Sequence, residues 1–263
     1  MRPNPVPWPQ RLYSNFILAP PFLLTTVFFG SLTLIASLWD KSGRLQHRIA
    51  RQWARTSVFF SGSRLQVFGL ENIPVETAVF AGNHTSYMDT PVVFASLPFQ
   101  FRILAKKELW TMPFIGWHLN RSGQIPVDTV SSNSTVSSLG AAVRALRAGM
   151  PLFVFPEGAR TPDGSTQPFL AGAAFLAIRA QVPLVPIALS GVYDLLPMHT
   201  RHFYPGEITL MVGEPISTTG MTLRQVEELN SRLREIIERM RAEASAERSS
   251  PARDSSVSAP TGI

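Results

Sequence analysis

The sequence predicts an α/β fold: a single domain with a mixed, largely buried sheet flanked by helices, preceded by an N-terminal membrane helix motif. From about Arg64, short apolar runs alternate with helical segments, and residues 16–39 carry no charge. The 263 residues suffice for one sizeable α/β domain with appendages. We therefore expect membrane-associated helices over 1–62, the α/β domain over 63–244 and a disordered tail over 245–263.

The uncharged segment from Phe16 to Trp39 is long enough to interact with a bilayer, because a span needs about 20 apolar residues. Pro20 and Pro21 are expected to break it, since proline disrupts a helix interior. A helix from Pro21 to Trp39 would be about 28 Å long, which suits a span, a re-entrant helix or an interfacial helix. A cleaved signal peptide and a buried core helix are the alternatives. The length of the segment and the lack of a small-x-small site disfavour the signal peptide.

A basic stripe follows this segment, with cations at spacings of three and four that share one face of a helix. Its members are Lys41, Arg44, Arg48, Arg51 and Arg55. An ordinary solvated face is the simplest interpretation, but the adjacent apolar segment favours contact with anionic lipid head groups. The positive-inside tendency then predicts a membrane protein with its α/β domain on the cytoplasmic face, although Arg2 and Arg11 on the other flank slightly weaken this inference.

The remaining elements follow from hydrophobic patterning and turn residues. Strands are expected over 65–68, 77–81, 101–105, 151–155, 184–189 and 208–212, and helices over 90–96, 136–147, 172–179 and 222–242. The polar stretch 129–135 has no strand pattern and is expected to be a loop, and the Ser-, Ala- and Pro-rich residues 245–263 are expected to be disordered.

Composition excludes several classes of chemistry. The chain has no cysteine, which rules out disulfides, thiolate metal sites and a cysteine nucleophile. No nucleophile elbow, dinucleotide or phosphate loop, or zinc-protease motif occurs, and the five histidines have no metal-site spacing. We expect neither a metal nor a bound cofactor. The net charge of +6 and the pI near 10.3 suit an anionic partner.

The first candidate site segment, Asn83–Asp89, follows an apolar strand-like run, where α/β sheets bind ligands. On one continuous helix, His84 and Asp89 would face different directions. If His84 lies in the turn and Asp89 in the first helical turn, Asp89 can bind one ring nitrogen. The other nitrogen can then take a proton from an acceptor hydroxyl. Taken alone, His84 is more simply explained as a core histidine, and Asp89 as a helix cap.

The second candidate segment follows the buried run 153–156 and contains Glu157, Gly158, Arg160 and Thr161. Gly158 permits a positive φ or a close backbone approach. Arg160 can bind a phosphate in a bidentate manner, and Glu157 can orient Arg160 or contact acceptor hydroxyls. A surface turn with an ion pair is the alternative interpretation.

These segments, Asn-His-x4-Asp and Phe-Pro-Glu-Gly-x-Arg-Thr, resemble the first and third motifs of the glycerolipid acyltransferase family, which includes bacterial 1-acyl-glycerol-3-phosphate acyltransferases. The resemblance covers about residues 64–215, and the two motifs lie 73 positions apart from His84 to Glu157. Residues 105–109 with 123–128 look like the second motif, and 182–186 like the fourth.

The resemblance implies an acyltransferase domain in which His84 is the general base and Asp89 its orienting partner. It implies that Lys106 and Arg160 bind phosphate and that Glu157 helps to bind the acceptor. Gly158 and Thr161 belong to the same substrate-binding motif. The implied reaction moves a fatty acyl group from acyl-CoA or an acyl carrier protein thioester to the free hydroxyl of a lysophospholipid, in phospholipid biosynthesis. Membrane lipids, the lysophospholipid acceptor and the thioester donor are then the partners, and nucleic acid is not expected.

One position departs from the family pattern. The second motif usually ends in Asp-Arg, with the arginine linked to acceptor phosphate, whereas Thr129 follows Asp128 here. We therefore consider a lysophospholipid with a larger head group, or a lyso-aminolipid, as an alternative acceptor. Two other classes stay open: a lipid hydrolase that uses the same His/Asp pair on water, and a lipid-binding or anchoring protein with a relic site.

Overall fold

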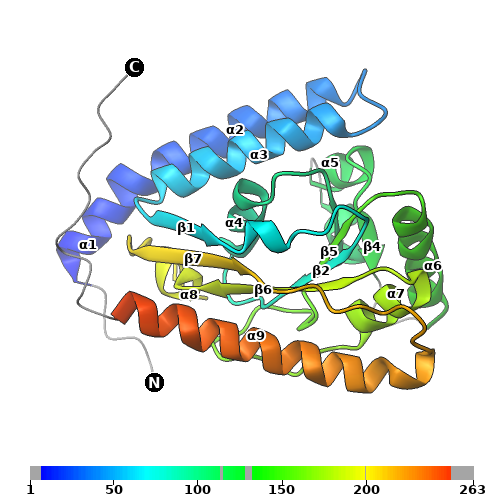
Figure 1. The fold of residues 1–263 in the computed structure, drawn as a ribbon. Coiled ribbons are helices and arrows are strands. Elements are labelled where there is room, and N and C mark those ends of the chain that lie inside the picture. The colour runs from blue at the N-terminus through cyan, green and yellow to red at the C-terminus, as the bar shows by residue number, and fades with distance from the viewer. Residues whose placement is uncertain (1–6, 113–114, 128–131, 199, 250–263) are drawn as a thin grey trace, which may run out of the picture.

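The structure, a computed structural model, describes residues 7–112, 115–127, 132–198 and 200–249. Its centre is a seven-stranded sheet of order β1-β7-β6-β2-β5-β3-β4 (Figure 1). All neighbouring strands are parallel except β6 and β7, so the sheet is mixed, as predicted. The strands are β1 (Arg64–Phe68), β2 (Val79–Gly82), β3 (Arg102–Lys106), β4 (Ile125–Val127), β5 (Leu152–Val154), β6 (Leu184–Ser190) and β7 (Glu207–Val212).

Helices cover both faces of this sheet (Figure 1). Successive side chains of a strand point to opposite faces, and β2 shows the consequence. Phe80 joins a core with α3 (Arg44–Phe60) and α4 (Asp89–Ser96). Val79 and Ala81 join a second core with α6 (Ser132–Arg147), α7 (Gly172–Ala180) and α9 (Val226–Ser249). With both faces buried, β2 reads as a continuous apolar run rather than an alternating one.

The N-terminal helix is continuous from Trp8 to Ala36, so the predicted break at Pro20 and Pro21 is wrong. It consists of α1 (Trp8–Leu12), a π-helical turn η1 (Tyr13–Leu18) and α2 (Ala19–Ala36). In the wider turn, the Ala19 N–H donates to the Ser14 carbonyl, five residues back. The turn ends where the prolines begin, and a local π turn is one way for a helix to accommodate residues that lack a donor.

This helix is long and apolar enough to cross a membrane, by length and composition. Large apolar side chains such as Leu24, Val27 and Phe28 are exposed along it, which indicates membrane association. Helix α3 runs back beside α2, and the Trp53 indole N–H donates to Thr26 Oγ1 at 3.1 Å (Figure 1). The basic stripe lies on α3 as predicted, apart from Lys41, which precedes the helix.

Most predicted elements are confirmed to within a few residues, with four differences. Strand β4 and helix α5 (Ile115–Arg121) were not predicted. Helix α6 begins at Ser132, so the expected loop 129–135 is helical from there, and 129–131 lie outside the described residues. Helix α9 continues to Ser249, five residues into the expected disordered tail 245–263. The remaining short elements are η2 (Leu70–Asn72), η3 (Lys107–Thr111), α8 (Val192–Leu195) and η4 (Leu223–Gln225).

Candidate active site

The candidate site lies where neighbouring parallel strands end. Parallel neighbours β2, β5 and β3 place their carboxyl ends at one edge of the sheet, where open α/β sheets bind ligands. His84 follows β2, Glu157 follows β5, and Lys106 is the last residue of β3.

Asn83 fixes the chain as it leaves β2. Its side-chain amide donates to the Leu189 carbonyl at 3.0 Å, and its Oδ1 accepts from the Leu189 N–H at 2.8 Å. This two-point link continues the β2–β6 pairing through a buried side chain, where a hydrogen bond is expensive to lose. The backbone just before His84 is therefore held in place.

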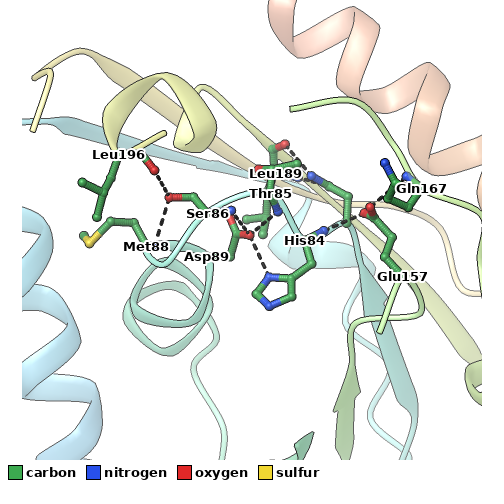
Figure 2. A network of polar contacts seen from close by, with 10 residues as sticks. His84, Thr85, Ser86, Met88, Asp89, Glu157, Gln167, Leu189 and Leu196 are labelled. Carbon is green, nitrogen blue, oxygen red and sulfur yellow. Dashed lines mark hydrogen bonds and ion pairs between the residues drawn. The ribbon is translucent and has the colours of Figure 1, made fainter. Parts of the chain in front are cut away.

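His84 and Asp89 are paired as the turn hypothesis expected (Figure 2). Asp89 is the first residue of α4 and is fully buried. Its Oδ2 lies 2.9 Å from His84 Nδ1 and also accepts the N–H groups of Thr85 at 2.6 Å and Ser86 at 2.8 Å. Because this carboxylate oxygen accepts hydrogen bonds, it favours the His84 tautomer with the proton on Nδ1.

The His84 ring is held in plane by Phe155. The two rings stack with their centroids 4.0 Å apart and at 18° to each other. The side chain is 13% exposed, and within the described residues no hydrogen bond engages Nε2. The ring thus has one nitrogen fixed and the other available to a ligand.

Glu157 binds two segments of backbone (Figure 2). Its Oε1 accepts the His84 N–H at 2.7 Å, and its Oε2 accepts the Gln167 N–H at 2.9 Å. Burial raises the pKa of this carboxyl, while the two backbone donors and the charge of Arg241 oppose that shift. Through the first of these contacts, Glu157 helps to position the backbone of His84. A role of Glu157 in acceptor binding stays a prediction.

Arg160 and Thr161 bring the second segment against the first. The Thr161 N–H donates to the His84 carbonyl at 3.3 Å, and the Arg160 guanidinium carbon lies 4.0 Å from the centre of the Tyr87 ring. Gly158 has a φ of +68°, and a Cβ there would approach Leu170 Cδ1 to 2.9 Å, which explains the glycine.

Lys106 lies apart from this group. It is exposed at the end of β3, and β5 separates its strand from β2. In the described part of the chain no hydrogen bond or ion pair joins it to the His84–Asp89 pair. Thr129, the residue that departs from the family pattern, lies outside the described residues. No group of three metal-ligating side chains occurs within 7–112, 115–127, 132–198 and 200–249.

Sequence reasoning found the segments but missed three contacts: the Asn83–Leu189 link, the backbone bonds of Glu157 and the Arg160–Tyr87 stack. Except for the Glu157–Gln167 bond, each of these contacts joins residues far apart in the chain. Both motifs gave a sequence signal for the residues, but not for these pairings.

Comparisons with known proteins show which family the chain resembles. A family model described as "Acyltransferase" matches residues 64–190. A chloroplastic 1-acyl-sn-glycerol-3-phosphate acyltransferase of Brassica napus is 32% identical over 68% of this chain and 53% of its own length. A 1-acyl-sn-glycerol-3-phosphate acyltransferase of Pseudomonas aeruginosa is 29% identical over 84% of this chain and 91% of its own length. The chain spans about half the length of the curated plant relatives it matches.

The fold has a solved counterpart. The crystal structure of the 1-acyl-sn-glycerophosphate acyltransferase PlsC from Thermotoga maritima superposes with a TM-score of 0.75 at 26% identity. The match covers 90% of this chain and 98% of that one. The family model, these relatives and the solved structure together show that the chain belongs to the glycerolipid acyltransferase family.

Proposed function

We propose that this protein transfers a fatty acyl group from a thioester donor to the free hydroxyl of 1-acyl-glycerol-3-phosphate. The observation that supports the proposal most is the pairing of His84 with a buried Asp89, which leaves Nε2 available. Arg160, a cation suited to phosphate, lies on the segment bound directly to His84. The names of the relatives favour this acceptor.

In the proposed reaction, His84 Nε2 takes the proton of the acceptor hydroxyl as its oxygen attacks the thioester carbonyl carbon. Asp89 holds the Nδ1 proton and stabilises the charged ring. The carbon–sulfur bond then breaks, and the thiolate takes a proton from Nε2. An ester and a free thiol result, and no enzyme nucleophile is used. The donor is a thioester of coenzyme A or of acyl carrier protein.

We further propose that the protein lies on the cytoplasmic face of a membrane with the α2–α3 pair in the interface. Arg44, Arg48 and Arg55 are exposed on α3, which runs beside α2. A perpendicular span of α2 would carry these cations into hydrocarbon, at about 2.5–3.5 kcal/mol each. With α2 along the surface, its apolar side enters one leaflet and the cations meet anionic head groups.

The test is acylation of a panel of lysolipids by the purified protein in detergent, with His84→Ala in parallel. We expect ester formation on lysophosphatidate that falls by at least about 10² in the variant, as for loss of a general base. Exclusive acylation of a lyso-aminolipid or a lysophospholipid with a larger head group would favour the alternative suggested by Thr129. Thioester hydrolysis without ester formation would favour the hydrolase.

A further inference from the structure

Tyr87 is not part of the hydrophobic core, although it lies between two buried residues. Its side chain is 52% exposed, whereas its neighbours Ser86 and Met88 are buried. It lies in the connection from His84 to Asp89, so a turn held by several hydrogen bonds to Asp89 carries a large, exposed ring. A ring in this place is available for contact with another group.

That group is Arg160. Its guanidinium carbon lies 4.0 Å from the Tyr87 ring centre, a distance at which a cation and an aromatic face attract each other. Among the described residues, the Arg160 side chain has no ion pair or hydrogen bond, and its Nε is buried without a partner. The stack with Tyr87 is therefore the contact that orders this cation.

The stack also leaves the functional part of the guanidinium open. A guanidinium stacked on an aromatic face uses its flat surface and keeps its N–H edge for a bidentate phosphate. A carboxylate partner would occupy that same edge. Tyr87 can thus order Arg160 without competing with an anionic substrate.

The contact spans the two segments of the site. Tyr87 follows His84 by three residues, and the His84 backbone is bound to Glu157 and to the Thr161 N–H. A cation fixed to Tyr87 is consequently fixed relative to the ring that accepts the proton.

We propose that Tyr87 is a positioning residue that holds Arg160 ready for the phosphate of the acceptor and sets its place relative to His84. The inference rests on the proposed function and adds a residue to it. An ordered Arg160 binds phosphate without first losing side-chain freedom, so the benefit appears in acceptor binding. The proton transfer at His84 does not involve Tyr87.

The test is a double-mutant cycle on the full-length protein in detergent, with kcat and KM measured for 1-acyl-glycerol-3-phosphate. We expect Tyr87→Leu to raise KM about threefold to thirtyfold, the range of a cation–aromatic contact, with kcat within about threefold. Tyr87→Gln should behave alike, and Tyr87→Phe, which keeps the aromatic face, should restore KM to within about twofold. In an Arg160→Ala background, Tyr87→Leu should change KM no further.

Phe68→Leu, on the exposed side of strand β1, is the matched control for loss of a surface ring. Equal effects of Tyr87→Leu with and without Arg160 would overturn the inference, as would a fall in kcat at constant KM. A wild-type protein that does not acylate lysophosphatidate would overturn the proposed function and this inference with it. An active protein with independent Tyr87 and Arg160 would overturn the inference alone.

Discussion

Asp89→Asn is the substitution that separates orientation of His84 from mere burial. The side chain keeps its shape, and an amide oxygen can still accept the Thr85 and Ser86 N–H groups. The lost feature is the negative charge that holds the proton on His84 Nδ1, 2.9 Å away. The ring can then place its proton on Nε2, where it no longer acts as a base.

The expected cost follows from this geometry. A general base contributes about 10²–10⁴ in rate, which corresponds to about 2.7–5.4 kcal/mol of activation free energy. We expect Asp89→Asn to lower kcat within this range and to leave the KM of the acceptor within about threefold. Because His84 and Asp89 act as a unit, adding Asp89→Asn to His84→Ala should cause little further loss.

The assay is thiol release from the acyl thioester in the presence of lysophosphatidate. Asp163→Asn is the matched control, since Asp163 is an exposed carboxylate that accepts hydrogen bonds from Ser165 in its own turn. It should keep activity to within about twofold. An Asp89→Asn protein with more than a third of wild-type kcat, or a double variant in which the two losses multiply, would show that the charge of Asp89 does not orient His84 for catalysis.

Three further outcomes are expected. Gly158→Ala should lower the free energy of unfolding by about 1–2 kcal/mol, because φ is +68° and the new methyl meets Leu170; thermal unfolding measures it, and an unchanged Tm would contradict the account. Burial lowers the pKa of His47 to about 4 from 6.5, so neutral His47 adds stability that is present above pH 6.5 and is lost towards pH 4, by up to about 3 kcal/mol. His47→Phe should therefore make the free energy of unfolding, measured by urea denaturation, depend less on pH between these values. The same pH dependence in variant and wild type would contradict this. Arg241→Met should lower kcat several-fold with Tm nearly unchanged, because Arg241 donates hydrogen bonds to Thr166 and to the Gly164 carbonyl in the loop between Glu157 and Gln167. An unaltered kcat would show that these bonds are dispensable.

The sheet and most helices were predictable because their apolar runs are long enough to be read locally. Strand β4 was not, since it has three residues, contains Pro126 and depends on pairing with β3. Residues 132–135 have weak helix formers and look like a loop, yet they form the first turn of α6. Tertiary context decides such segments.

The candidate site divides in the same way. The approach of His84 to Asp89 was predictable because a short turn brings them together whatever the rest of the chain does. The contacts of Glu157 with the His84 N–H and of Arg160 with Tyr87 were not, since they join segments 73 residues apart and depend on the register of β2 against β5. The continuous helix through Pro20 and Pro21 was missed because a π turn leaves no pattern in the sequence.

The most direct test of the central claim measures thiol released and ester formed in one reaction of wild-type protein with a labelled acyl thioester and lysophosphatidate. We expect one ester for each thiol and almost no thiol release when the lysolipid is omitted. Thiol release that proceeds without lysophosphatidate and yields free fatty acid would show that the His84–Asp89 pair activates water, and would contradict acyl transfer.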